Sequence, residues 1–192
     1  QPLPLINKIV LMACRLLADK GVYEFHQSVL LLKEKYSNVR FVLVGGVDPD
    51  NPASLTEQEL NEWVTNNDLE WWGHQTNMSK VLSQATIVVL PSYREGMPKV
   101  LLEAQALGRP IVTTDVPGCR EAIENNKTGF LVKVKEKQSL ANAIEKLINN
   151  DDLCLEFSQN ARVLAEQKFD IKQVVKTHMN IYENLIQSHH AN

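Results

Sequence analysis

Two glutamates near the start of an expected helix are suited to binding sugar hydroxyls. Glu95 and Glu103 are separated by seven residues, and the loop at residues 91–98 contains the first of them. The free amides of the first helical turn, at Lys99 and Val100, form a natural phosphate site. Glutamates near a helix start are also common in ordinary helices, because the helix dipole favours them. The spacing alone therefore leaves both interpretations open.

Two cations on another loop suit the same chemistry. Arg15 and Lys20 follow the first apolar run of the chain, at residues 8–14. Fixed cations can stabilise developing negative charge without a metal, and one such donor is typically worth about 3 kcal/mol. The alternative for each residue is an ordinary solvated charge on a loop. A shared site requires a fold that brings residues 15–20 and 95–103 together.

Short apolar runs alternate with amphipathic segments along most of the chain, which predicts that fold. We expect strands at 8–14, 39–45, 69–73, 86–90, 110–114 and 129–132, and helices at 22–36, 56–66, 78–84, 98–107, 119–124, 137–149, 152–167 and 171–187. Thr56 and Glu59 form a capping box for the second helix, and Gly108 should end the fourth. The pattern predicts an α/β fold, a Rossmann-like doubly wound parallel sheet of about six strands with helices on both faces. Ligands bind at the carboxyl ends of such strands, so the loops after Cys14, Gly45, Gly73, Leu90 and Thr114 are the candidates.

The composition excludes several classes of protein. The net charge is -3 and no basic stripe stands out, which argues against a nucleic-acid partner. The apolar runs are too short to cross a membrane. The three cysteines are far apart, which fits a reducing compartment better than a disulfide scaffold; Cys14 should be a small core residue. The glycine triplet of a dinucleotide site is absent, which argues against NAD.

An ordered set of motifs resembles one known family. Pro91-Ser-Tyr-Arg-Glu-Gly-Met-Pro-Lys-Val-Leu-Leu-Glu103 is similar to the signature of the retaining GT-B glycosyltransferases of family 4, also called glycosyl transferases group 1. Residues 15–21 resemble the family's arginine–lysine loop, residues 72–82 its base-binding turn, and residues 114–118 and 128–132 its later glycine turns. Residues 92–99 and 115–121 look most like enzymes of capsule, O-antigen or lipid-linked oligosaccharide assembly.

The resemblance implies a role for each site residue. Glu95 would bind hydroxyls of the donor sugar close to the anomeric carbon and would be the catalytic residue. Glu103 would bind the ribose hydroxyls. Arg15 and Lys20 would neutralise the diphosphate. The remaining donor-binding residues belong to two segments. The loop and helix start after Glu95 contribute Gly96, Met97, Pro98, Lys99 and Val100. The base-binding turn contributes Gly73 and His74. No metal is expected, because GT-B enzymes generally do not need one for catalysis, and no cofactor other than the nucleotide-sugar substrate.

The resemblance also implies only half of an enzyme. Residues 1–192 would form a single donor-binding domain, and residues 170–188 the helix that crosses back to an acceptor domain not included here. That helix has an apolar stripe at Val174, Val175, Met179, Tyr182 and Leu185. The chain starts at Gln1 rather than Met, so we expect a piece of a longer protein.

The implied partners are the missing N-terminal domain, a nucleotide-sugar (a UDP-sugar, often a UDP-N-acetylhexosamine) and a lipid-linked or saccharide acceptor. The implied location is cytoplasmic, with the parent protein peripheral to the inner face of the cell membrane. Two alternatives remain: a non-catalytic sugar-nucleotide-binding module, and a fragment of a GT-B-type UDP-sugar epimerase.

Several other polar or aromatic residues have ordinary explanations. Asp48-Pro-Asp50 imitates a metal-binding DxD motif, but its prolines favour a turn. His26 and His178 should be surface or packing residues, and His189-His190 the chain end; no histidine has a partner at zinc-ligand spacing. Trp71 and Trp72 alternate along an expected strand, so at least one should be in the core.

Overall fold

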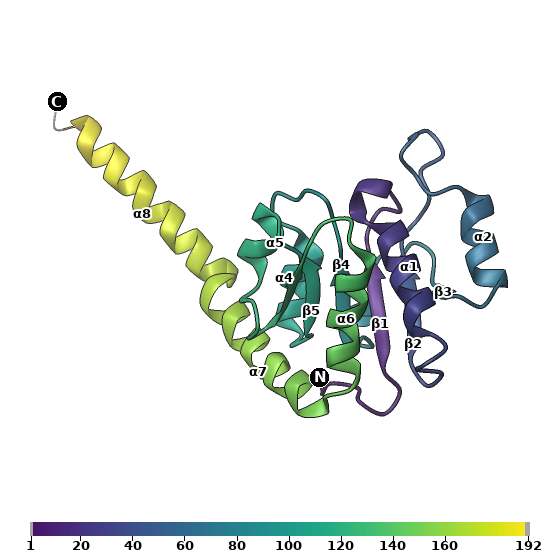
Figure 1. Cartoon of the computed structure of the whole chain (residues 1–192). Coiled ribbons are helices and arrows are strands. Elements are labelled where there is room, and N and C mark those ends of the chain that lie inside the picture. The colour runs from purple at the N-terminus through teal and green to yellow at the C-terminus, as the bar shows by residue number, and fades with distance from the viewer. Residues whose placement is uncertain (1, 191–192) are drawn as a thin grey trace.

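The computed structural model describes residues 2–190, and its centre is one parallel sheet (Figure 1). The six strands lie in the order β3-β2-β1-β4-β5-β6, and every neighbouring pair is parallel. The order reverses between β1 and β4, so the sheet is doubly wound and Rossmann-like, as predicted. The strands are β1 Ile9–Ala13, β2 Arg40–Val44, β3 Glu70–Trp71, β4 Ile87–Leu90, β5 Ile111–Thr114 and β6 Gly129–Val132.

Helices cover both faces of this sheet, and each face has its own hydrophobic core. The short helix η1 spans Ala18–Lys20, and the α-helices are α1 Val22–Leu32, α2 Glu57–Thr65, α3 Met78–Leu82, α4 Lys99–Ala106, α5 Pro117–Ala122, α6 Lys137–Ile148, α7 Asp151–Lys168 and α8 Ile171–His190. In β1, Val10 and Met12 face the core under α1, α2, α6 and α7, whereas Leu11 faces the core under α3, α4 and α5. Because both faces are covered, the central strands β1 and β4 are continuous apolar runs.

Local signals explain several element ends. Thr56 accepts a hydrogen bond from the Glu59 amide, and the Glu59 side chain accepts one from the Thr56 amide, so the predicted capping box is confirmed. Gly108 follows α4 with a φ of 63°, which a glycine adopts without strain, so this predicted helix end is also confirmed. Asn150, by contrast, caps α7 through its side chain, a signal that the sequence analysis did not use.

Some predicted bounds were wrong. The helix expected over residues 22–36 ends at Leu32, where the amides of Lys35 and Tyr36 both bond to the Leu32 carbonyl and close the last turn. The helix expected at residues 119–124 begins earlier, because the proline at its first position fits that place. Pro98 is not the first helical residue of α4 but the extended residue before it.

The prediction of a long third strand with a core tryptophan was also wrong. Only Glu70 and Trp71 pair with β2, so β3 is a short edge strand. Trp71 is 40% exposed and donates to the Gly45 carbonyl. Trp72 is half-buried, packs against the core from its rim and lies under the Arg40 guanidinium. An edge strand has one open side, so neither ring becomes enclosed.

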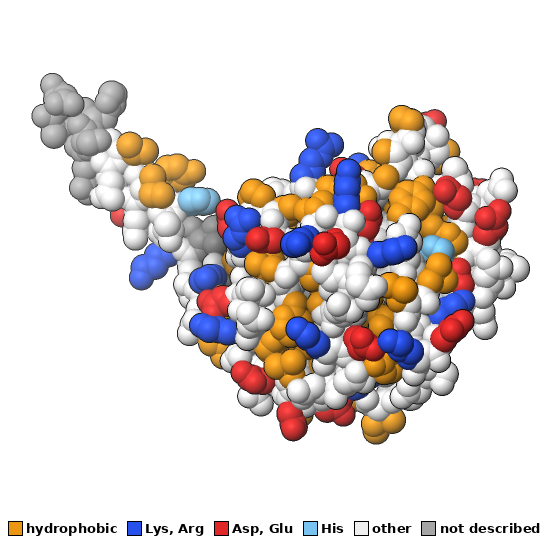
Figure 2. All heavy atoms as spheres, in the orientation of Figure 1, with side chains coloured by type: hydrophobic (Ala, Val, Ile, Leu, Met, Phe, Trp, Pro, Cys, Tyr) orange, Lys and Arg blue, Asp and Glu red, His pale blue; other side chains and the backbone are white. Residues whose placement is uncertain are grey.

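The last helix, α8, extends away from the rest of the molecule (Figure 1). Its apolar side chains Ile171, Val175, Met179, Tyr182 and Leu185 are each at least half exposed. Hydrophobic side chains are also visible along the arm that projects from the body in Figure 2. The predicted stripe therefore lies uncovered, except that the side chain of Val174 falls outside the described residues. Within the described residues, no helix is both long and apolar enough to cross a membrane.

Candidate functional site

A cavity of about 600 Å³ lies at the carboxyl ends of β1 and β2. The switch in strand order is beside it, where open α/β sheets bind ligands. Its walls come from the ends of both strands, the loops after them, the turn before α3 and the first turns of α4. The lining residues are Ala13, Cys14, Arg15, Val44, Gly45, Gly46, Val47, Asp48, His74, Gln75, Met78, Lys99, Val100 and Glu103.

Five of the predicted site residues line this cavity. Arg15 reaches it from the end of β1, and His74 from the turn after β3. Lys99, Val100 and Glu103 reach it from α4, whose first amides have no partner within the helix and can bind an anion. The Lys99 ammonium lies 3.4 Å from the Glu103 carboxylate, on a largely exposed pair. One wall thus offers cations and free amides, and the same helix offers a carboxylate.

Glu95 and Lys20 do not line the cavity but pair with each other. Lys20 Nζ lies 2.7 Å from Glu95 Oε1, and the two side chains are only 16% and 13% exposed. Cys14 does line the cavity, and it is close enough for the charges of Lys20 and Glu95 to affect the pKa of its thiol. The pair therefore lies beside the cavity, past Cys14, rather than inside it.

The other predicted residues lie next to these groups. Gly73 precedes His74 in the turn after β3 and has a φ of 68°, which favours glycine. Gly96 is exposed, and Met97 is 45% exposed, directly after Glu95. Pro98 is buried at the start of α4, so its ring supports the helix rather than facing the cavity.

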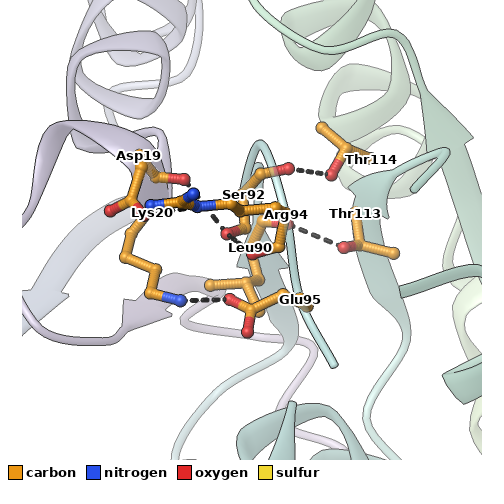
Figure 3. A network of polar contacts seen from close by, with 8 residues as sticks. All are labelled: Asp19, Lys20, Leu90, Ser92, Arg94, Glu95, Thr113 and Thr114. Carbon is orange, nitrogen blue, oxygen red and sulfur yellow. Dashed lines mark hydrogen bonds and ion pairs between the residues drawn. The ribbon is translucent and has the colours of Figure 1, made fainter. Parts of the chain in front are cut away.

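Hydrogen bonds hold the loops after β1, β4 and β5 together (Figure 3). The Ser92 hydroxyl lies 3.1 Å from the Asp19 carbonyl, and the Tyr93 amide donates to the same carbonyl at 2.8 Å. Thr114 donates from β5 to the Ser92 carbonyl. Ser92 and Thr114 are completely buried. Lys20 and Glu95 thus come from two loops whose relative position is fixed by buried polar contacts.

Sequence reasoning missed several cavity residues. Gly46, Val47, Asp48 and Gln75 line the cavity without having been named as binding residues. The loops after Gly45 and Gly73 were candidates, so the available signal was their place at strand ends. Gly45 has a φ of 145°, and a Cβ there would lie 2.0 Å from the Cys14 carbonyl, which shows how closely β1 and β2 end together. Asp48 lines the wall from the proline-rich turn.

Burial lowers the reactivity expected of the Cys14 thiol in the cavity wall. Cys14 is half-buried, although a core position was predicted, because one side of it faces the cavity. Burial raises the pKa of the Cys14 thiol to about 12, against the opposing effect of Lys20. A raised pKa leaves little thiolate near neutral pH, which disfavours Cys14 as a nucleophile.

The fold and the cavity define an α/β domain with a ligand site at the carboxyl edge of its sheet. The sequence model of the family described as "Glycosyl transferases group 1" matches residues 2–164. The chain therefore belongs to the glycosyl transferases group 1 family.

Curated relatives of the chain are bacterial glycosyltransferases. The N,N'-diacetylbacillosaminyl-diphospho-undecaprenol alpha-1,3-N-acetylgalactosaminyltransferase of Campylobacter jejuni is 37% identical over 94% of this chain and 46% of that protein. The capsular polysaccharide biosynthesis glycosyltransferase CapM of Staphylococcus aureus is 30% identical over 90% of this chain and 45% of that protein. The chain thus spans less than half the length of these relatives.

Solved structures share the fold. Staphylococcus aureus TarM, in a complex that includes UDP, superposes with a TM-score of 0.80 and 26% identity over 92% of this chain and 36% of that chain. Anabaena HepE in complex with UDP gives a TM-score of 0.80 and 25% identity over 95% of this chain and 50% of that chain. The predicted fold class and family are confirmed.

Proposed function

We propose that this chain is the donor-binding half of a retaining GT-B glycosyltransferase that uses a UDP-sugar. One observation carries the proposal: Arg15, Lys99, Val100 and Glu103 line one cavity at the switch point of the sheet, beside the Lys20–Glu95 pair. The two structural neighbours above are both complexes with UDP, which supports uracil as the base of the donor.

In this proposal the nucleotide occupies the cavity and the sugar points toward Glu95. Glu103 accepts hydrogen bonds from the ribose hydroxyls, and the amides of Lys99 and Val100 bind the diphosphate together with Arg15. The base lies against Gly73 and His74. Lys20 stabilises the charge that develops on the departing diphosphate. Glu95, with the backbone of Gly96 and Met97, binds the transferred sugar.

Protein cations take the place of a metal in this scheme. Among the described residues, no group of three or more histidine, cysteine, aspartate or glutamate side chains is arranged to hold a metal ion. Calorimetric titration of UDP with and without a chelator tests this part. We expect equal dissociation constants, and loss of binding in the chelator would contradict it.

The parent enzyme, we further propose, contains an acceptor domain that covers the apolar stripe of α8. The relative from Campylobacter jejuni is named for an undecaprenyl-diphosphate-linked acceptor, which supports a lipid-linked acceptor at the inner, cytoplasmic face of the membrane. The chain by itself should bind donor weakly and transfer nothing, because the other wall of the active site is missing. A turnover assay on the isolated chain tests this, and robust transfer would contradict it.

The decisive experiment is calorimetric screening of the chain against UDP, GDP, ADP and their sugars. We expect UDP to bind best, and Glu103→Ala to weaken it about tenfold or more, since a hydrogen bond to a charged group is worth about 1.5–3 kcal/mol. Glu156→Ala, at an exposed glutamate on α7, is the matched control. Equal UDP affinity in wild type and Glu103→Ala would show that Glu103 does not bind UDP.

A further inference from the structure

The loop that bears Glu95 is held between two glycines: Gly21, which precedes α1, and Gly118, in the first turn of α5. On one side Gly21 approaches Pro91 so closely that a Cβ at Gly21 would lie 2.2 Å from the Pro91 carbonyl oxygen. On the other side, a Cβ at Gly118 would lie 1.9 Å from the Gly96 carbonyl oxygen and 2.7 Å from that of Glu95. Both contacts are with backbone, which cannot rotate out of the way as a side chain can.

The glycine at position 118 is required for space rather than for backbone conformation. Gly21 has a φ of 78°, so it has two reasons to be glycine, but Gly118 is not among the residues with positive φ. Gly118 is buried in the first turn of α5 and packs directly on the Glu95–Gly96 peptide. Its missing side chain therefore sets how closely α5 approaches the Glu95 loop.

A buried hydroxyl at the end of β5, four residues before Gly118, holds the other end of this loop. Thr114, the last residue of β5, donates to the Ser92 carbonyl, and both residues are fully buried (Figure 3). Thr113, the residue before it, donates instead to the carbonyl of Leu90, at the end of β4. The β5–α5 turn thus contacts the Glu95 loop at Ser92 through Thr114 and at Glu95 and Gly96 through Gly118.

We propose that Gly118 and Thr114 are positioning residues that set the place of the Glu95 carboxylate and thereby the strength with which the site holds the sugar part of its donor. The inference rests on the proposed sugar-binding role of Glu95. Neither residue lines the nucleotide cavity, whose walls come from the ends of β1 and β2 and from α4. Changes at Gly118 or Thr114 should therefore alter sugar binding and leave nucleotide binding intact.

The first test compares two ligands that differ only by the sugar. Calorimetry gives dissociation constants for UDP and UDP-N-acetylglucosamine, and their ratio reports the contribution of the sugar. We expect Gly118→Ala to change this ratio about tenfold, since a misplacement of about 1 Å at a site can cost up to about 100-fold, and to leave the UDP constant unchanged.

Gly129→Ala is the matched control. A Cβ at Gly129 would lie 2.1 Å from the Ile111 carbonyl oxygen, an equally severe backbone contact at the other end of β5. Both variants should be destabilised, but only Gly118→Ala should change the ratio. An equal change in both variants, or in neither, would overturn the proposal.

A double-mutant cycle with Glu95→Gln shows whether Gly118 acts through Glu95. If it does, the ratio of the two dissociation constants in the combined variant equals that in Glu95→Gln alone, so the two effects are not additive. Additive effects would overturn the proposal. Failure of the proposed function gives a different result. If Glu95 does not bind the sugar, Glu95→Gln alone leaves the ratio of the two dissociation constants unchanged.

Thr114 supplies a test that adds no heavy atom to the buried contact with Ser92. Thr114→Val removes the hydroxyl at nearly constant volume, and we expect the ratio to change in the same direction as in Gly118→Ala. Thr114→Ser keeps the hydroxyl and should restore the wild-type ratio, whereas Thr113→Val, the control on the same strand, should leave it unchanged. Equal ratios in Thr114→Val and Thr113→Val would overturn the role of Thr114.

A crystal structure of Gly118→Ala tests the geometry without any ligand. Real Cβ atoms essentially never come within 3.0 Å of such an atom, so one of the two backbones must move by about 1 Å. We expect the Gly96 carbonyl to be displaced. We expect the Glu95 backbone to move with it and the Lys20–Glu95 pair to change its geometry. An unmoved Glu95 would overturn the proposal whatever the binding measurements give.

Discussion

At the scale of single residues, the pairing of Lys20 with Glu95 joins two groups that are proposed to bind different parts of the donor. Lys20 would contact the diphosphate and Glu95 the sugar, yet in this structure each is the other's partner at 2.7 Å. A donor would therefore compete with an existing ion pair for both groups. Because both side chains are mostly buried, each offsets the burial cost of the other's charge, and this contribution is larger than in an exposed pair.

Removing one member of the pair should reveal that contribution. We expect Lys20→Met to lower the free energy of unfolding by about 1–3 kcal/mol, since it leaves a mostly buried carboxylate without its partner. Urea unfolding followed by circular dichroism measures it. The combined variant with Glu95→Gln should recover part of the loss. Lys127→Met breaks an exposed pair with Glu124 and is the control; equal losses in the two lysine variants would contradict the prediction.

The three thiols offer a second test at this scale. Burial raises the pKa of Cys14 to about 12, raises that of Cys119, and raises that of Cys154 to about 11. Only the thiolate is alkylated, so at pH 7.5 the native chain should react slowly with iodoacetamide at every cysteine. Unfolded chain should take up three equivalents, one for each cysteine. Mass spectrometry over time measures both, and rapid single labelling of the native chain at Cys14 would contradict this prediction.

At the scale of elements, a polar cluster fastens α2 and the turn after it to α1. His26 of α1 stacks on Trp63 of α2 with ring centroids 4.0 Å apart, and its Nε2 lies 2.8 Å from the Asp68 carboxylate. Lys33 also pairs with Asp68. His26 was predicted to be a surface or packing residue, and the structure shows it in the second of these roles. Burial opposes ionisation of Asp68, but the hydrogen bonds from Lys33 and His26 outweigh it and hold the pKa of this carboxyl below its ordinary value.

This lowered pKa has a definite consequence for stability. A carboxyl whose pKa is lower in the folded chain stabilises the fold above its ordinary pKa of about 4, and that stabilisation is lost as the pH falls toward the folded value. We expect Asp68→Asn to cost about 2 kcal/mol at pH 7, and the gap to wild type to narrow below about pH 4. Denaturant unfolding from pH 3 to 7 measures it, with Asp50→Asn in the exposed loop as the control. A gap that does not change with pH would contradict the prediction.

At the scale of the whole molecule, α8 is separate from the body that holds the site (Figure 1). Its described apolar side chains are exposed, whereas α7 buries Cys154, Phe157 and Ala161 in the core. The domain body should therefore be stable without α8, and its core should end with α7.

Truncation tests this division. A chain that ends at Asp170 should unfold within about 2 °C of the full chain, because little buried surface is lost, and should associate less at high concentration. Calorimetry and light scattering measure the two effects. A chain that ends at Gln159 loses the buried residues Ala161 and Leu164 and should be strongly destabilised. A large fall in unfolding temperature at Asp170 would show that α8 is part of the core.

The sequence by itself determined the elements and the edge of the sheet at which the site lies. Strands covered on both faces are rich in apolar and β-branched residues, so β1, β2, β4, β5 and β6 could be found from their residues alone. The capping box of α2 and the glycine after α4 are local signals of the same kind. The ordered motifs then indicated the family, which the match over residues 2–164 confirms.

Only the tertiary structure decided which of the candidate residues meet. Lys20 and Glu95 are 75 residues apart, and they pair because β1 and β4 are neighbours in the sheet. The same order places Arg15 and Glu103 in one cavity, leaves Trp71 on an open edge, and seats Gly118 against the Glu95 loop. Spacing along the chain cannot reveal these distances, because they depend on the order in which the strands assemble.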